Sequence, residues 1–401
     1  MRKTVVFWMV FCCSAMRLFA QGSQLDHFFE KYNLAEISRH SFAKTVLTAE
    51  DCDLLAPSLI DAWQREIYER LEPEMEKGHV RYGDLTMPYA DVEYGEVPQE
   101  GHSLYISLHG GGATTQQVND EQWQNQLRLY APTEGIYVAP RAPWNDWNMW
   151  FKPGMDELLE RLVQWYVAVK EVNPNRIYLL GYSAGGDGVW RLAPRMADRW
   201  AAASMMAGHP GEAQQVNLIN LPFMIWMGEN DNAYHRNEEA RKKGWVMDSL
   251  EQAEPLTYVH ETHIVPGKGH WMDRADTVAV AWMANFERDP LPLHVVWRQE
   301  DVVRSDFYWL EVEQAKACPG MRVDVLRNGN KVEILRCDYP KLRIYLNDEM
   351  MDLDENVTVV YQGKVLFDGR LKRTLGTMAR TLLERGDYHW MFSTYVDITI
   401  Q

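Results

Sequence analysis

Cysteine is scarce in this sequence, and residue spacings typical of metal sites are missing from it. Only 5 of the 401 residues are cysteine, and two of these fall in the apolar stretch at the N-terminus. The other three, Cys52, Cys318 and Cys337, are an odd number and cannot all pair within one chain. Cys318 and Cys337 lie on neighbouring predicted strands, where they would form either a disulfide or two buried thiols. Because no Cys-x-x-Cys pair or histidine-rich spacing occurs, we expect no metal ion and no other cofactor.

Positive charge is in deficit as well, and no apolar run is long enough to span a membrane. The 57 Asp and Glu residues outnumber the 41 Lys and Arg residues, and the net charge of -16 argues against a nucleic-acid partner. The apolar run Val5–Met16 is shorter than a membrane-spanning helix. Since Arg2 and Lys3 precede it, we interpret residues 1–20 as a signal peptide cleaved after Ala20. This predicts a secreted or periplasmic protein without a stable membrane span.

What is present is the composition of a globular protein with more than one folded unit. Hydrophobic residues make up 46% of the sequence, enough for sizeable cores, and 401 residues exceed an ordinary single domain. Residues 21–86 are rich in charge and in helix formers, which predicts a helical N-terminal extension. Asp289–Pro292 indicates a boundary, so we assign residues 87–289 to one domain and residues 290–401 to another.

The hydrophobic pattern differs between these two domains. Before the boundary, short apolar strands alternate with amphipathic helices such as Met155–Val172, which predicts a mainly parallel sheet with helices on both faces. After it, short runs alternate with period two, and Asn328–Asn330 and Gln362–Gly363 have the composition of hairpin turns. One helix is expected near the end, at Thr374–Arg385. The predicted fold class is therefore α/β, with a small β-rich C-terminal domain.

One tight turn carries a serine in a pattern typical of nucleophiles. The apolar run Arg176–Gly181 predicts a strand, the amphipathic run Asp187–Trp200 predicts a helix, and Gly-Tyr-Ser-Ala-Gly joins them. On such a turn the hydroxyl of Ser183 projects into a cleft, and the backbone N–H of Ala184 points at a developing oxyanion. The pattern alone is weak evidence, so the catalytic interpretation depends on a base and an acid elsewhere.

A serine hydroxyl is a poor nucleophile at neutral pH unless a base accepts its proton and an acid orients that base. Downstream of Ser183, the predicted strand Met224–Gly228 is followed by Asp231, and the strand Thr257–Val265 is followed by a glycine-rich loop with His270. The order serine, acid, histidine, each after a strand, is the order that goes with such a serine turn. We therefore predict Ser183 as nucleophile, His270 as general base and acid, and Asp231 as the orienting acid.

Other acids and histidines nearby leave alternatives. Glu229 lies closer to the strand end than Asp231 and could supply the acid. Asp273 lies close to the predicted histidine, but at a helix entry, which favours an N-cap role. His260 and His263 fall inside a predicted strand, where packing or surface positions are expected.

Loops after predicted strands offer residues for the oxyanion and the substrate. The run His-Gly-Gly-Gly follows a strand, and its glycines let the backbone aim an N–H at the substrate, with Gly111 as the expected donor. Trp147 and Trp150 belong to a loop rich in Trp and Asn, where at least one ring is expected to face the cleft; the alternative is that the rings pack into the core. His209 and Tyr182 are further candidates for substrate binding.

Together these motifs resemble one branch of a large enzyme family. Leu108–Gly112, Gly181–Gly185, Gly228–Asp231 and Gly269–His270 look like the poly(3-hydroxybutyrate) depolymerase and feruloyl-esterase branch of the α/β-hydrolases. The resemblance covers residues 87–286. It implies a carboxylic ester hydrolase that works through an acyl-enzyme, with the three residues predicted above as its triad. The substrates it implies are small-molecule or polysaccharide esters, including acetyl or feruloyl esters of plant polysaccharide.

Two other functions stay open on the sequence. The Gly-Tyr-Ser-Ala-Gly turn also resembles that of prolyl-oligopeptidase-type serine peptidases, although the N-terminal segment is far too short for the β-propeller that precedes their catalytic domain. The second alternative is a non-catalytic glycan-binding protein that keeps the hydrolase fold. Trp297, Trp309 and Trp390 could then be binding platforms, but we favour buried positions for them. The sequence leaves the oligomeric state open.

Overall fold

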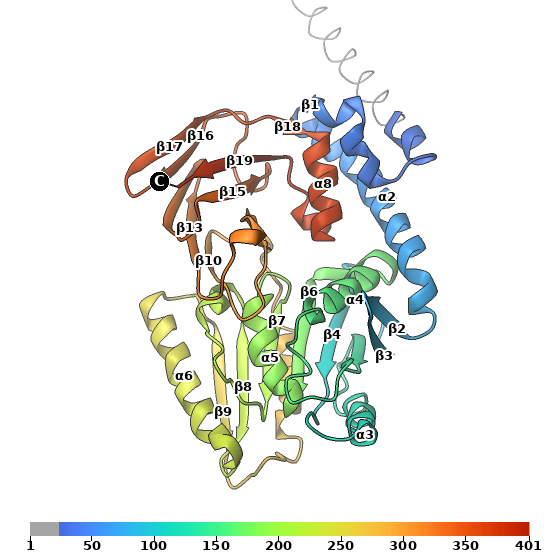
Figure 1. Ribbon diagram of the computed structural model, residues 1–401, viewed down its shortest axis with the longest axis vertical. Coiled ribbons are helices and arrows are strands. Elements are labelled where there is room, and N and C mark those ends of the chain that lie inside the picture. Colours follow the sequence, from blue (N-terminus) through green and yellow to red (C-terminus); the bar gives the residue numbers. More distant parts are fainter. Residues whose placement is uncertain (1–23, 401) are drawn as a thin grey trace, which may run out of the picture.

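An eight-stranded sheet forms the centre of the structure, a computed structural model that describes residues 24–400. The predicted signal peptide lies outside these residues. The strand order is β2-β3-β5-β4-β6-β7-β8-β9 (Figure 1). The strands are β2 (His79–Tyr82), β3 (Leu85–Tyr94), β4 (His102–Leu108), β5 (Gly135–Pro140), β6 (Val172–Tyr182), β7 (Ala202–Met206), β8 (Phe223–Gly228) and β9 (His260–Val265).

Six strands of this sheet, from β5 to β9 in spatial order, run parallel, whereas β3 is antiparallel to both of its neighbours, β2 and β5. In the register, Leu108 of β4 lies beside Gly181 of β6, and Tyr182 lies beside Met206 of β7. The carboxyl ends of the parallel strands therefore meet at one edge, where loops of open α/β sheets bind ligands. The predicted mainly parallel sheet is confirmed.

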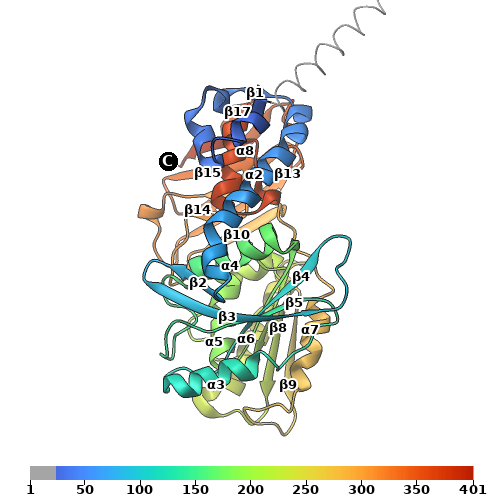
Figure 2. The same ribbon diagram turned by 90° about the vertical axis from the view of Figure 1, so that its right-hand side faces the viewer.

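Helices cover both faces of the sheet, as predicted. Side chains alternate between the faces of a strand, so Leu179 of β6 faces one core and Tyr178 faces the other. The first core also contains buried side chains of α4, α5 and α6, and the second contains those of α7, which lies on the opposite side in Figure 2. The helices are α3 (Gln116–Gln126), α4 (Met155–Val169), α5 (Ala184–Arg195), α6 (Arg236–Ala253) and α7 (Val278–Met283).

The N-terminal segment contacts both the sheet region and the C-terminal part of the chain. Its long helix α2 (Ala49–Met75) begins with a capping box between Thr48 and Asp51 and packs on α4 and on α8 (Leu375–Arg385). Strand β1 (Val46–Leu47) pairs with β18 (Arg373–Thr374). The segment is not wholly helical, because β2 and the start of β3 form a hairpin at the edge of the central sheet.

The C-terminal part is β-rich, as predicted, and contains two small sheets. One has the order β10-β13-β14-β16-β17, and the other has the order β11-β12-β15-β19. Their strands are β10 (His294–Arg298), β11 (Asp306–Phe307), β12 (Leu310–Glu311), β13 (Arg322–Asn328), β14 (Lys331–Cys337), β15 (Lys341–Leu346), β16 (Val357–Tyr361), β17 (Lys364–Gly369) and β19 (Thr394–Thr399). Short 3-10 helices lie at Leu34–Arg39, Ser41–Lys44, Val216–Asn220, Ala233–His235, Ala275–Thr277, Gln314–Lys316 and Tyr388–Trp390.

The structure decides two alternatives for the C-terminal part, the burial of its tryptophans and the pairing of its cysteines. Trp297, Trp309 and Trp390 are buried, which confirms the core positions favoured above and excludes them as exposed platforms. Both thiols are free, so the disulfide alternative is wrong for this structure; the alternative of two buried thiols holds for Cys337 only, because Cys318 is exposed.

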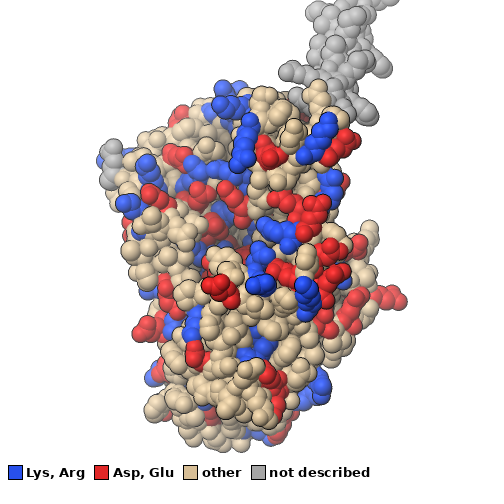
Figure 3. Space-filling view, turned by 45° about the vertical axis from the view of Figure 1, so that its right-hand side comes forward, with Lys and Arg blue, Asp and Glu red and all other residues tan. Residues whose placement is uncertain are grey.

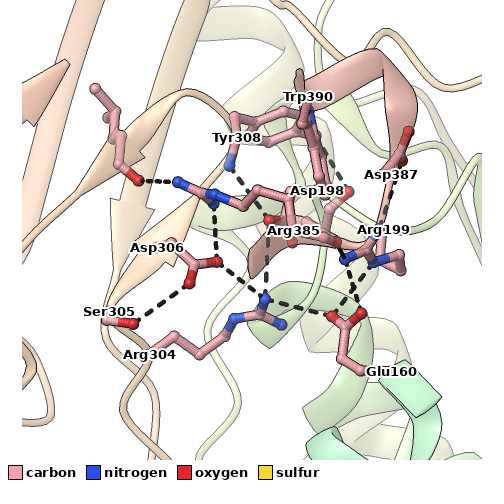
Figure 4. A network of polar contacts seen from close by, with 12 residues as sticks. Glu160, Asp198, Arg199, Arg304, Ser305, Asp306, Tyr308, Arg385, Asp387 and Trp390 are labelled. Atoms are coloured by element: carbon pink, nitrogen blue, oxygen red, sulfur yellow. Dashed lines mark hydrogen bonds and ion pairs between the residues drawn. The ribbon is translucent and has the colours of Figure 1, made fainter. Parts of the chain in front are cut away.

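A buried network of charges joins the C-terminal part to the sheet region (Figure 4). Arg199 pairs with Glu160 of α4 at 2.7 Å and with Asp387 at 3.5 Å, and Arg288 pairs with the same Asp387 at 2.6 Å. The ring of Trp390 lies 4.6 Å from each of these two guanidinium groups. The two parts are therefore joined by a packed polar interface and not only by the connecting chain.

Candidate active site

The predicted nucleophile lies on a strained turn between β6 and α5. Ser183 has φ 58° and ψ -119°, a backbone conformation that L residues rarely adopt, and its N–H donates to the carbonyl of Met206 at 2.9 Å. Gly185 permits this close packing, because a Cβ there would overlap the carbonyl oxygen of Leu108. The strand–turn–helix context predicted for the serine is therefore present.

The structure brings His270 and Asp231 to the serine from two other strands. Nε2 of His270 lies 2.9 Å from Oγ of Ser183, and its Nδ1 lies 2.7 Å from Oδ2 of Asp231. Asp231 is buried, and Nη1 of Arg236 lies 3.5 Å from its second carboxylate oxygen. This arrangement can accept a proton from the serine hydroxyl and stabilise the imidazolium that results.

The alternative acids and histidines do not reach the serine. Glu229 accepts a hydrogen bond from the N–H of Gly267 at 2.7 Å, so it supports the loop that carries His270 and not the imidazole. Asp273 forms an ion pair with Lys268. His260 contacts Asp248, and the ring of His263 stacks on Trp226, as expected for packing or surface positions.

Tyr182, a candidate for substrate binding, connects the serine turn to the histidine loop. Its hydroxyl donates to the carbonyl of His270 at 2.7 Å and accepts from the N–H of Met272 at 3.2 Å. Burial raises the pKa of this hydroxyl, so it stays protonated and keeps its donor. The side chain is nearly buried, and its polar group is already engaged by the protein. It therefore positions the loop that carries His270, a role that sequence reasoning missed because the contact spans residues far apart in the chain.

The glycine run after β4 is held by a buried amide. Oδ1 of Asn119 accepts from the N–H of Gly112 at 2.8 Å, and its Nδ2 donates to the carbonyls of Thr114 and Thr115. Gly111 has φ +106°, and a Cβ there would overlap the Asn119 side chain. Within residues 24–400, no acceptor is found for the N–H of Gly111. Asn119 was not singled out from the sequence, because an Asn on an amphipathic helix has no distinguishing spacing.

Within the described residues the N–H of Ala184 also has no acceptor, so both predicted oxyanion donors are available. Ala184 begins α5, where the helix dipole adds to the attraction for negative charge. A carbonyl oxygen that becomes an oxyanion beside Ser183 would meet these donors without prior breaking of protein hydrogen bonds.

Trp150 does not face the cleft, which corrects the expectation that its ring contacts substrate. Its side chain is 0% exposed, and its Nε1–H donates to the carbonyl of His109 at 2.9 Å. The imidazole of His109 donates from Nδ1 to Gly110 and accepts the N–H of Ala142 at Nε2. Burial lowers the pKa of His109 to about 3, so the ring is neutral and can accept. Both aromatic side chains thus support the glycine run from below the cleft surface.

Two hollows meet at Ser183. The histidine-side hollow, of about 430 Å³, is lined by amide side chains and one exposed indole, and the helix-side hollow, of about 620 Å³, begins at α5. Both volumes are typical of ligand sites. The first is lined by Gly110, Gln122, Asn125, Gln126, Arg128, Leu129, Tyr182, Ser183, His270 and Trp271. The second is lined by Gly111, Gly112, Ala113, Trp147, Phe151, Ser183, Ala184, Asp187, Arg191, His209, Gly211, Tyr234 and Arg236.

Trp147 and His209 face the helix-side hollow, where substrate-binding roles were expected for them. Trp147 is 63% exposed, and its ring packs edge-on against Phe151 with centroids 5.6 Å apart. Burial lowers the pKa of His209, which favours a neutral ring. Among residues 24–400 no group of three or more potential metal ligands is found, and no helix in that range is long and apolar enough to cross a bilayer.

Comparison with known proteins gives one family match. Residues 141–270 match the model of the dienelactone hydrolase family, a segment that contains the serine, the acid and the histidine. A search of curated proteins finds no significant match. Solved structures similar to this chain include a thermostable esterase, at 18% identity and TM-score 0.41, and a ferulic acid esterase, at 18% identity and TM-score 0.38. Est1E from Butyrivibrio proteoclasticus is similar at 14% identity and TM-score 0.33.

These similarities are partial in length. They cover 53%, 51% and 52% of this chain, and 64%, 96% and 95% of the respective solved chains. The match thus spans less than two thirds of the thermostable esterase. Both the sheet topology and the serine turn agree with the family match. The chain therefore has the α/β-hydrolase fold, and its residues 141–270 match the dienelactone hydrolase family model, in keeping with the resemblance drawn from its motifs.

Proposed function

We propose that this protein is a serine carboxylic ester hydrolase that works through an acyl-enzyme. One observation carries the proposal: Ser183, His270 and Asp231 lie in a continuous line of hydrogen bonds, at 2.9 Å and 2.7 Å. A hydrolase family domain covers all three residues. Secretion, which the N-terminal sequence predicts, would give such an enzyme access to polysaccharide esters, including acetyl or feruloyl esters of plant material.

The reaction runs in two halves. His270 takes the proton of Ser183 as the serine oxygen attacks the ester carbonyl, and the N–H groups of Gly111 and Ala184 hold the oxyanion. The C–O bond to the alcohol then breaks, and His270 returns the proton to the departing oxygen. In the second half, His270 deprotonates a water molecule that attacks the acyl-enzyme. The C–O bond to Ser183 then breaks, His270 returns the proton to the serine oxygen, and the free acid leaves.

Turnover of a short-chain 4-nitrophenyl ester tests the proposal. Wild-type protein should hydrolyse the ester and become labelled by a fluorophosphonate probe, whereas Ser183→Ala should do neither. Ser249→Ala is a matched control, since Ser249 is exposed on α6. Equal turnover by wild type and Ser183→Ala would reject the nucleophile. Absence of labelling in wild type would favour a binding protein, and cleavage of peptide nitroanilides in preference to esters would favour a peptidase.

The choice of acid is tested separately. Asp231→Asn should lower kcat by about four orders of magnitude, because the imidazole loses the partner that fixes its orientation. Glu229→Gln should lower kcat far less, because Glu229 contacts the loop and not the ring. Measuring kcat for both variants decides the assignment; the opposite ranking would give the role to Glu229.

A further inference from the structure

Two arginines that line the helix-side hollow lack hydrogen-bond acceptors. Arg191 of α5 and Arg236 at the start of α6 have side chains only 12% and 14% exposed. Within residues 24–400, neither guanidinium group donates a hydrogen bond, and Nε of Arg236 is buried without a partner. Comparably buried arginines elsewhere do donate, among them Arg141, Arg195, Arg199, Arg288 and Arg385. Buried donors are rarely left unsatisfied, so these two guanidinium groups are suited to an external acceptor.

Neighbouring carboxylates do not fill this role. Nη1 of Arg191 lies 3.7 Å from Asp301, and Nη1 of Arg236 lies 3.5 Å from Asp231, both beyond the usual hydrogen-bond distance. Asp231 is engaged by the catalytic imidazole, and Asp301 lies closer to Arg195, at 3.2 Å. The contacts of the two arginines with the protein thus leave most of their N–H groups free.

Aromatic rings hold both guanidinium groups beside the hollow. The Arg191 group lies 5.3 Å from the ring centroid of Phe151, and the Arg236 group lies 4.9 Å from that of Tyr234. Such contacts stabilise a cation without using its N–H donors. They also reduce the motion of the side chains, so less entropy is lost when a ligand binds.

One acid of the hollow competes for these cations. Asp187 accepts the backbone N–H of His209 at 2.6 Å. Burial raises the pKa of Asp187 to about 6, which shows that the two arginines do not fully offset its desolvation. The ionisable groups that line the hollow are therefore the two arginines, Asp187, Tyr234 and His209, whose lowered pKa favours the neutral form.

We propose that the helix-side hollow binds a carboxylate at the far end of the acyl group, so that the preferred substrates are half-esters of dicarboxylic acids. This inference rests on the proposed esterase activity. A guanidinium group offers paired donors that match the two oxygens of a carboxylate. The acyl group belongs on this side because Gly111 and Ala184, the oxyanion donors, line this hollow. The alcohol leaves on the other side, since His270 lines the histidine-side hollow and must reach the departing oxygen.

Matched substrates test the inference. The mono-4-nitrophenyl esters of glutaric, adipic and pimelic acid are compared with 4-nitrophenyl esters of unsubstituted acids of equal length, each corrected for spontaneous hydrolysis. Wild type should show a kcat/KM at least about tenfold higher for one or more carboxylated members, the gain expected from charge-assisted hydrogen bonds. Arg191→Gln should reduce this ratio about tenfold, and Arg191→Lys should reduce it less, because the charge remains but the paired donors are lost.

Controls separate the inference from the underlying activity. Arg241→Gln removes one positive charge from the exposed part of α6 and should keep the wild-type ratio. Arg236→Gln should also lower the ratio, with an added loss on both substrates, since Arg236 lies beside Asp231. A wild-type ratio near one for every chain length would overturn the inference while leaving the esterase proposal intact. If no ester of either series is hydrolysed, the esterase proposal itself fails.

Discussion

At the residue scale, the side-chain roles that sequence reasoning found differ from those it missed in the range of the contacts on which they depend. Ser183, Asp231 and His270 each follow a strand in a fixed order, so local patterns were enough to select them. Tyr182 and Asn119 act through hydrogen bonds to backbone groups of other loops, and only the folded chain brings those groups near. A single sequence contains no pattern that distinguishes them from core or surface residues of the same type.

Removal of one hydroxyl should weaken catalysis without altering the triad. Tyr182→Phe keeps the ring but deprives the carbonyl of His270 and the N–H of Met272 of their partner, so the base is held less firmly. We expect kcat to fall about tenfold, with KM for a small ester nearly unchanged. Tyr178→Phe is the matched control, because Tyr178 lies on the same strand as Tyr182 but away from the site. Its hydroxyl donates to the carbonyl of Phe286 at 2.9 Å. Equal kcat losses in the two variants would contradict a positioning role.

The buried carboxyl of Asp187 should make stability depend on pH. Its pKa rises from 3.8 to about 6 on folding, so the folded state binds the proton more tightly than the unfolded chain. The free energy of unfolding therefore falls as pH rises from 3.8 to about 6, and this loss stays constant at higher pH. Asp187→Asn keeps the acceptor for His209 and should raise the free energy of unfolding by about 2 kcal/mol at pH 7.5 and hardly at all at pH 4. Urea titrations at both pH values check this; a gain of equal size at both would show that charge is not the cause.

At the element scale, α3 and the loop before it determine the shape of the cleft. Thr115 caps the helix by accepting the N–H of Val118, and Asn119, one turn on, holds the glycine run. A helix in this part of the chain was predicted among those that alternate with the strands, and it is observed at Gln116–Gln126. The sequence did not predict which face of this helix contacts the glycine run, because its polar sequence has no clear apolar stripe.

Loss of the Asn119 amide should affect the oxyanion donors more than substrate binding. In Asn119→Ala the N–H of Gly112 loses its acceptor, and the backbone at Gly111 can turn away from the reacting oxygen. We expect kcat for a 4-nitrophenyl ester to fall by about tenfold to a hundredfold, with a small change in KM. Asn125→Ala, on the same helix but lining the hollow, is the comparison variant and should alter KM more than kcat. A loss confined to KM in Asn119→Ala would remove the argument.

At the scale of the whole molecule, the site and the C-terminal sheets lie at opposite ends of the central sheet. The triad follows the carboxyl ends of the parallel strands, whereas β10 contacts the segment that leads into β8, and Arg288 contacts Asn175 near the start of β6 (Figure 1). Neither hollow is lined by a residue beyond 271.

On the face shown in Figure 3, acidic and basic side chains are interspersed over the upper part. The sequence predicted two units but not this placement of the site and the C-terminal sheets, because the buried network that fixes it joins residues nearly two hundred positions apart.

Breaking that network should destabilise the whole chain. Arg199→Met leaves Glu160 and Asp387 without one of their partners in a buried setting, which should lower the free energy of unfolding by about 3 kcal/mol. Arg241→Met at the surface should change it little. Calorimetry checks both and should record one transition for wild type, since the interface couples the two parts. Two separate wild-type transitions, or no loss in Arg199→Met, would contradict the coupling.

The separation of the site from the C-terminal sheets bears on how the protein can be immobilised. The N-terminal segment around β1 and the C-terminal end of the chain both lie toward the end of the molecule that carries the C-terminal sheets, remote from the carboxyl ends of the parallel strands (Figure 1). Coupling through either position to a bead, a partner domain or a polymer film turns the catalytic end outward. An insoluble substrate then meets the cleft directly, and the β-rich sheets act as a spacer of fixed length between the support and the reaction.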